Sequence, residues 1–283
     1  MRIPRSAVSG IVNPAIPGRM ASLMMSLLYQ FEQTQWLPPE ELFFHQARQL
    51  RLLFRHAATT VPFYRERFAA AGVSAGCCTA CAASCTINTT ALPPSHGKRH
   101  QIETSGSTGR PVRLFGTEVT GVFWRACVMR EHLWQDRDFS RKLAAIRWVR
   151  KGAAMPPAGV RSDSWGPASG SIYPTGPPVL LNIASELREQ VAWLQRENPD
   201  YLISFPSNLA ALAKYCRENG IALTNLKQVM TVGEMVTDKV RNAVRESWGV
   251  PLKDSYSCEE TGYLAIQCPQ HDVYHVQSES VLL

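Results

Sequence analysis

The sequence predicts an α/β fold in which a largely parallel sheet is covered by helices and preceded by a helical N-terminal entry segment. Two observations carry this prediction. From residue 104 onward, short apolar segments alternate with helical patterns, which is typical of parallel sheets. Before residue 75, apolar residues recur at spacings of three and four, which indicates helices. A chain of 283 residues can bury a sizeable core and can hold one large domain or two.

Residues 1–75 are expected to form the helical N-terminal segment. The apolar run over residues 20–29 is too short to span a bilayer, and no small-residue cleavage site follows it. We therefore expect a helix packed on the protein, a cytoplasmic chain and no membrane insertion. Residues 38–41 begin a second helix, because proline is preset for the first turn and two glutamates face the positive end of the helix dipole. A short third helix is expected to run to Gly72.

Residues 76–103 are expected to form an irregular connector, rich in Cys, Thr, Ala and Pro and without a period. Four cysteines crowd there: Cys77, Cys78, Cys81 and Cys85. A metal could bind them, but their spacing lacks a paired second knuckle, so an irregular linker is the default interpretation. A cytosolic protein of this size needs no disulfides.

The α/β core is expected over residues 104–283. Strands are predicted over residues 112–115, 145–149, 201–203 and 226–232. Helices are predicted over residues 183–194, 207–220 and 237–249, with Ser207 and Thr237 capping the last two. Residues 153–178, heavy in Pro, Gly and Ser, are expected to form a long surface loop.

The chain is basic, since Lys and Arg exceed Asp and Glu by 30 − 23 = 7. A scattered basic surface suits nucleic acid, anionic lipid or a polyphosphate ligand. No recognised nucleic-acid motif accompanies the charge, so a nucleic-acid partner is not expected. Such a partner would show salt-sensitive binding that substitutions at Arg110 or Tyr256 leave intact.

One short loop combines hydroxyls, glycines and a basic group: Thr104, Ser105, Gly106, Ser107, Thr108, Gly109 and Arg110. Such a loop can bring backbone N–H groups and hydroxyls close to an anion, because glycine has no Cβ to hold the ligand away. It is neither a Walker A loop nor the Gly-x-Gly-x-x-Gly of a dinucleotide fold. A plain surface turn has the same composition, so both interpretations stay open at this point.

Two further groups of residues fall where predicted strands end. Gly233 and Glu234 follow the strand over residues 226–232, and Asp254, Ser255 and Tyr256 follow a short apolar segment. Ligands of parallel sheets bind at the carboxyl ends of the strands. We therefore expect these five residues to line a ligand site.

Taken in order, the loop at Thr104, Gly233-Glu234 and the segment over residues 254–262 resemble the adenylate-forming (acyl-CoA synthetase) superfamily. The resemblance is closer to its phenylacetate–CoA ligase branch, which includes capsular-polysaccharide biosynthesis proteins. Further segments similar to that branch are Thr34-Gln35-Trp36, His56-Ala57, residues 61–65, Phe205-Pro206-Ser207, Cys268-Pro269 and Tyr274-His275-Val276. The resemblance runs from about Leu23 to the last residue and is weakest over residues 75–100.

The resemblance implies an ATP-dependent, AMP-forming carboxylate–CoA ligase that makes an acyl-adenylate and then a thioester. The implied ligands are a small carboxylic acid (an aryl acid such as phenylacetate), ATP, Mg²⁺ and coenzyme A. The implied catalytic residues are Thr108, Arg110 and Glu260, with Glu260 matching the Mg²⁺-linked glutamate. The loop over residues 104–109 would cradle the pyrophosphate end, and Arg110 stands where the family usually has lysine. Tyr256 would stack on adenine in a slot lined by Gly233, Glu234, Asp254 and Ser255.

Ser257 and Glu259 depart from the family's usual glycine and Ser/Thr, which bears on ATP affinity, and Glu259 competes with Glu260 for the metal role. A zinc site is a further expectation, from thiolate and imidazole ligands within eighteen residues: Cys258, Cys268, His271 and His275. The alternative is a buried Cys268 beside surface histidines. Candidates for an acyl pocket are His132, Trp148 and Phe205, each of which would otherwise be core.

The family continues with a ribose-binding aspartate motif, a hinge and a small C-terminal domain that carries the catalytic lysine. None of these follows Gly262 in this sequence. We therefore expect the chain alone to turn over poorly. The alternative function is a non-catalytic nucleotide- or acyl-binding remnant, or a polysaccharide-biosynthesis protein on the same scaffold. Assembly as a homodimer is left open.

Overall fold

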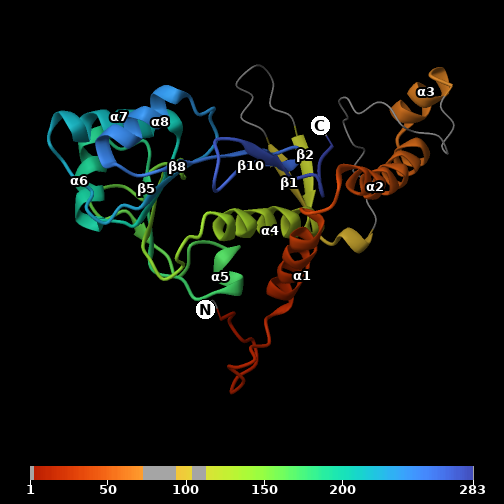
Figure 1. Cartoon of the computed structure of the whole chain (residues 1–283), viewed down its shortest axis with the longest axis horizontal. Helices are drawn as coiled ribbons and strands as arrows, with labels where there is room; N and C mark the ends of the chain where they lie inside the picture. The colour runs from red at the N-terminus through yellow and green to blue at the C-terminus, as the bar shows by residue number, and fades with distance from the viewer. Residues whose placement is uncertain (1–2, 73–93, 104–112, 283) are drawn as a thin grey trace. The chain divides into compact units, whose positions relative to one another are not determined.

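The computed structural model of the chain describes residues 3–72, 94–103 and 113–282 (Figure 1). The chain divides into two compact units. The first contains Met1–Leu23, Arg125–Ser257 and Ala265–His275, and the second contains Met24–Trp124, Cys258–Leu264 and Val276–Leu283. The expected boundaries of the connector at residues 76 and 103 stay predictions, since residues 73–93 and 104–112 lie outside the described ranges.

The first unit is built on a six-stranded sheet in the order β4-β5-β3-β6-β7-β8. Its strands are β3 Leu143–Arg147, β4 Val160–Arg161, β5 Pro178–Asn182, β6 Tyr201–Ser204, β7 Gln228–Thr231 and β8 Leu252–Lys253. The strands β5, β3, β6, β7 and β8 run parallel, and only β4 pairs antiparallel, at the edge beside β5. The predicted α/β fold with a largely parallel sheet is therefore confirmed.

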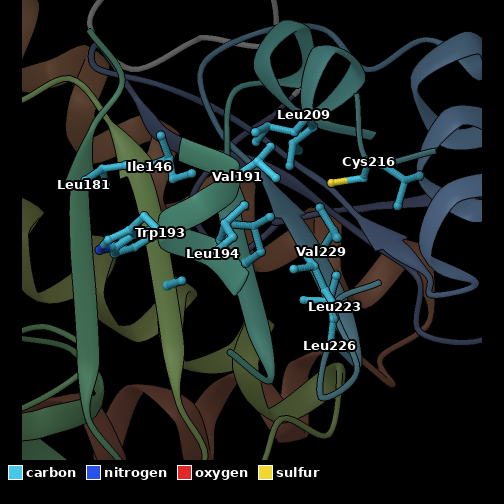
Figure 2. Close-up of a cluster of buried hydrophobic side chains, with 14 of the residues drawn as sticks. Ile146, Leu181, Val191, Trp193, Leu194, Leu209, Cys216, Leu223, Leu226 and Val229 are labelled. Atoms are coloured by element: carbon cyan, nitrogen blue, oxygen red, sulfur yellow. The ribbon is translucent and has the colours of Figure 1, made fainter. Parts of the chain in front are cut away.

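Three helices connect the parallel strands: α6 Leu187–Glu197, α7 Pro206–Glu218 and α8 Asp238–Trp248. The connections from β5 to β6, β7 and β8 all advance in the same direction across the sheet, so right-handed crossovers place these helices on one face. Their apolar sides share one buried cluster with the strands, including Ile146, Leu181, Val191, Trp193, Leu194, Leu209 and Val229 (Figure 2). Burying each such side chain contributes about 1.5–3 kcal/mol, which fixes the strand ends in place.

The other face of the sheet carries Leu143, Tyr201 and Met230, and Trp165 packs on it. The ring of Trp165 lies 5.3 Å from that of Tyr201 between centroids. The prediction of a surface loop over residues 153–178 is therefore wrong in part. That segment contains β4 and the short helix α5, Ser169–Ile172, and Ile172 is fully buried. Proline and glycine shape this segment, but its aromatic and aliphatic residues cover the sheet.

The second unit contains α1 Arg19–Thr34 from Met24 onward, α2 Pro39–Thr60 and α3 Pro62–Ala70. These helices confirm the helical N-terminal segment. A short 3₁₀ helix, η2 Pro94–His96, precedes a hairpin of β1 Arg99–Glu103 and β2 Arg113–Thr117. Strand β1 was not predicted, because Ile102 is its one apolar residue and no alternation marks it. The four crowded cysteines at 77–85 lie outside the described residues.

Helix α4, Glu118–Trp134, and a three-stranded sheet in the order β11-β10-β9 contribute residues to both units. The strands are β9 Ser255–Cys258, β10 Gly262–Gln267 and β11 Tyr274–Val276. Among the described residues, no helix combines the length and the apolar character that crossing a membrane requires.

Candidate functional site

The carboxyl ends of the neighbouring strands β6, β7 and β8 hold most of the expected ligand-binding residues of the first unit. Phe205 follows β6, Gly233 and Glu234 follow β7 after one residue, and Asp254 follows β8 directly. The register pairs Ser204 with Thr231, so the β6 and β7 ends are level with each other. The sheet thus brings together the residues that the sequence placed at separate strand ends.

Gly233 occupies a position that only glycine fits. Its φ is +75°, and a Cβ added there would lie 2.9 Å from the ring of Phe205. Both facts oppose any L side chain, one through backbone strain and the other through a steric clash. Phe205, a candidate for the acyl pocket, therefore packs directly against the β7 turn.

Glu234 is exposed and its carboxylate is held by the first turn of α7. The backbone N–H of Ser207 donates to Oε2 at 2.9 Å, and the Ser207 hydroxyl donates to Oε1 at 3.0 Å. A carboxylate at a helix N-terminus also interacts favourably with the helix dipole. The prediction that Ser207 caps α7 is wrong: the N-cap residue is Phe205, and Ser207 lies inside the helix as a donor to Glu234.

Asp254 is the centre of a polar network behind the strand ends. The Thr231 hydroxyl donates to Oδ1, and the Tyr274 hydroxyl donates to Oδ2 at 2.6 Å. Arg241 in turn donates to the Tyr274 hydroxyl at 2.9 Å. Burial, and then the Asp254 carboxylate, raise the pKa of Tyr274 to about 12. Both carboxylate oxygens of Asp254 are engaged, so this side chain orients the segment that follows it.

That segment enters β9, where Ser255 is partly buried and Tyr256 is 60 % exposed. A core role for Tyr256 is therefore excluded, and its ring is available for stacking. Trp148, another acyl-pocket candidate, follows β3 and is 68 % exposed. Thr231, Arg241 and Gln267, which support Asp254, were not predicted. They come from β7, α8 and β10, and no local pattern links them.

His132 does not lie at this edge of the sheet. It bonds Arg137, whose Nε donates to Gln228 Oε1 at 2.6 Å, and Gln228 is the first residue of β7. Arg137 also pairs with Glu131 at 2.9 Å, and its side chain is fully buried. Burial, and then the Arg137 charge, hold the pKa of His132 well below its usual value. These hydrogen bonds reach the amino end of β7 at Gln228, and the acyl-pocket role considered for His132 stays a prediction.

Of the three catalytic candidates, the structure describes Glu260 but not Thr108 or Arg110. Glu260 is exposed in the turn between β9 and β10 and belongs to the second unit. The whole phosphate loop, from Thr104 to Arg110 and including Thr108, lies outside the described residues. The roles expected for Glu260, Thr108 and Arg110 stay predictions.

The cysteine–histidine cluster is partly assembled. Cys268 is buried, and its Sγ lies 3.6 Å from His271 Nδ1. The backbone N–H of Gln270, followed by His275 and His271, lowers the pKa of the Cys268 thiol to about 6. Cys258, in the second unit, instead lies 3.1 Å from the Thr261 hydroxyl. No set of three or more His, Cys, Asp or Glu in the described part of the chain is arranged to hold a metal, so the expected four-residue zinc site is not formed there.

Comparisons with known proteins were made by sequence and by structure. No protein-family model matches the sequence. No curated protein matches it either. Solved structures do match, among them 2-hydroxyisobutyryl-CoA ligase in two states. The postadenylation state, in complex with R3-HIB-AMP, gives a TM-score of 0.56 at 18% identity over 83% of this chain and 53% of that chain. The open conformation, in complex with 2-HIB-AMP and CoA, gives a TM-score of 0.51 at 17% identity, over 79% of this chain and 55% of that chain.

The chain spans about half the length of these matched structures. At such low identity the likeness concerns the fold alone. The chain is therefore similar in its α/β fold to about half of the 2-hydroxyisobutyryl-CoA ligase chain.

Proposed function

We propose that the chain takes part in ATP-dependent activation of a carboxylic acid, and that the first unit supplies the adenine-binding part of the site. The observation that carries the proposal is the convergence at the β7 and β8 ends. Gly233 and Glu234 follow β7 and Asp254 follows β8, on a sheet whose ligands are expected at that edge, and Tyr256 lies two residues further along the chain, in β9.

The residues fit an adenine base. The exposed ring of Tyr256 offers a face for stacking, and base–aromatic stacking is worth about 1–3 kcal/mol. Gly233 leaves the β7 turn without a side chain that could obstruct a flat ligand. The Tyr274–Asp254 hydrogen bond fixes the residue that precedes β9. The backbone that leads to Tyr256 is therefore anchored two residues before it.

The proposed reaction follows from this fold class. A substrate carboxylate attacks the α-phosphate of ATP, forming an acyl-adenylate and releasing pyrophosphate; the thiol of coenzyme A then displaces AMP to give a thioester. Negative charge on the phosphoryl oxygens is what the protein must stabilise. The loop over residues 104–110 would donate to those oxygens, and Glu260 would hold the Mg²⁺ that offsets their charge.

The acid is proposed to be an aryl acid of the phenylacetate type. Exposed Trp148 and the ring of Phe205 at neighbouring strand ends would supply aromatic walls. The matched ligase was crystallised with the AMP adduct of a hydroxyisobutyryl group, so the fold also accommodates a smaller acid in that protein.

The test is a titration of ATP–Mg²⁺ into purified chain by isothermal calorimetry, with and without phenylacetate. Tyr256→Ala should weaken binding about tenfold, the loss of one stacked base. Tyr29→Ala is the matched control, because Tyr29 is also exposed (69%) and belongs to helix α1. Equal affinity of wild type and Tyr256→Ala for ATP–Mg²⁺ would show that Tyr256 does not bind adenine.

A second readout separates catalysis from binding. Acid-dependent exchange of labelled pyrophosphate into ATP supports the ligase proposal. Nucleotide binding without any exchange, across a panel of aryl and aliphatic acids, would instead favour a non-catalytic nucleotide-binding role.

A further inference from the structure

A basic loop begins at the last residue of the central strand β3, and its cations have no part in the site described above, although Trp148 within it is also the acyl-pocket candidate. We define it as residues 147–151, which contain Arg147, Arg150 and Lys151 with Trp148 between them. All three cations are exposed, and none forms an ion pair with any carboxylate of the described residues. Three exposed positive charges within five residues repel one another weakly in water, and a bound anion would offset that repulsion.

The segment directly after the basic loop is bonded to Asn182, the last residue of β5. The Asn182 backbone N–H donates to the Ala154 carbonyl at 2.8 Å, and its side-chain N–H donates to the Ala153 carbonyl at 3.1 Å. Asn182 is itself buried, with 2% of its surface exposed. A buried side chain that donates to the loop backbone fixes the path of the chain just after Lys151.

The backbone there is strained. Ala154 has φ +54° although it carries a Cβ, and it is buried. A non-glycine residue in the left-handed region costs about 1–3 kcal/mol and persists where its surroundings enforce it. The Asn182 bonds to the carbonyls of Ala153 and Ala154 supply that enforcement, so the backbone is fixed directly after Lys151.

The place of the loop in the topology favours ligand binding. In the sheet, β3 lies between β5 and β6. The chain leaves β3 toward β5 on one side and then crosses back to β6 on the other, so the connections diverge at the carboxyl end of β3. Ligands of open α/β sheets bind at such a switch point.

We propose that the basic loop binds the diphosphate of a nucleoside diphosphate, with the base against Trp148. The diphosphate of coenzyme A or of a nucleotide sugar carries two negative charges, which the three cations would offset, and guanidinium groups bind phosphate oxygens through two parallel hydrogen bonds. Trp148, 68% exposed, has a free face for the base. Coenzyme A and nucleotide sugars both contain this group. Coenzyme A as the source rests on the proposed function, whereas a nucleotide sugar does not.

The test uses calorimetric titration of the chain with coenzyme A, UDP-glucose and inorganic pyrophosphate at low and high salt. Replacing all three cations, Arg147→Gln with Arg150→Gln and Lys151→Gln, should reduce affinity at least about tenfold, as the loss of charge-assisted bonds requires. Wild-type affinity should fall as salt rises, since exposed charges are screened. Whichever of coenzyme A and UDP-glucose binds with the higher affinity identifies the class of molecule that supplies the diphosphate.

The matched control removes the same charge from the helix layer. It combines Lys214→Gln, Arg217→Gln and Arg245→Gln, all exposed positions on α7 and α8. This variant should bind as wild type does. Trp148→Ala should weaken the two nucleotides and leave pyrophosphate unchanged. Far-UV circular dichroism melts of every variant show that each is folded.

Three outcomes would overturn the inference: no diphosphate binding by wild type at millimolar concentration, equal affinity in wild type and the loop variant, or an equal loss in the helix-layer control. Failure of the proposed function is seen separately. If ATP–Mg²⁺ binding is absent or insensitive to Tyr256→Ala while the loop variant still loses UDP-glucose, the adenylation proposal falls and the basic loop stands.

Discussion

The hydrogen bond between Tyr274 and Asp254 gives a quantitative test of how the β8 end is held. Tyr274→Phe removes a hydroxyl that donates to a carboxylate at 2.6 Å and accepts from Arg241. Hydrogen bonds to charged groups are worth about 1.5–3 kcal/mol. Tyr274 is 40% exposed, so water replaces part of the loss and the lower value applies. We expect a loss of about 1.5 kcal/mol, equivalent to about 3–6 °C in melting temperature.

The effect should depend on pH in one direction. The pKa of Tyr274 is about 12 in the folded chain, above the value of about 10 for a free tyrosine. A raised pKa means that the stabilisation is complete below pH 10 and is lost as the pH rises toward 12. The difference in urea-unfolding free energy between wild type and Tyr274→Phe should therefore be constant from pH 7 to 9 and shrink above pH 10. Tyr29→Phe serves as the control, and a Tyr274→Phe variant as stable as wild type at pH 8 would refute the reasoning.

Two further predictions concern residues at the two ends of strand β7, Arg137 near its amino end and Gly233 after its carboxyl end. Arg137→Met removes a buried guanidinium that pairs with Glu131 and donates to Gln228, so it should cost about 3–5 kcal/mol in urea unfolding, and a loss below 1 kcal/mol would contradict the proposed burial of the network. Gly233→Ala meets both a positive φ and the Phe205 ring, whereas Gly249→Ala meets a positive φ with open space around it. The first should therefore destabilise the chain more than the second, by about 1 kcal/mol or more, and equal effects would show that the Phe205 contact is absent.

Much of the sheet could be predicted from the sequence because its elements follow local rules. Helix α8 shows this: Thr237 is its N-cap residue, Val240 and Val244 face the core, and Gly249 ends it in the left-handed conformation. Strand β5 was missed because it begins at Pro178, after a segment rich in proline and glycine. Proline at the first position of a strand disrupts no ladder bond, so the strand forms although the pattern argues against it.

Helix α4 was missed for a different reason. Its C-terminal half buries polar as well as apolar residues, among them Arg130, Glu131 and His132 beside Met129. A helix buried on most of its circumference has no polar face, and therefore no amphipathic period to detect. Glu131 and His132 contact Arg137, which lies just beyond the helix end, and Arg130 lies over the ring of Trp134.

In the candidate site, too, features that follow local rules were predicted and contacts between distant residues were not. Gly233, Glu234 and Asp254 were predicted at strand ends, because the position of a strand end follows from the strand itself. The hydrogen bonds that hold them were not predicted, since the donors Ser207 and Tyr274 are each 20 or more residues away in sequence. Both Asp254 oxygens accept hydrogen bonds within the protein, and the nucleotide contact expected for this residue stays a prediction.

The most direct test of the central claim is a crystal structure of the chain grown with AMP and phenylacetate. The account predicts the adenine ring stacked on Tyr256, beside the Gly233 turn at the carboxyl ends of β7 and β8. An ordered AMP bound elsewhere on the chain, with Tyr256 still exposed to solvent, would contradict it.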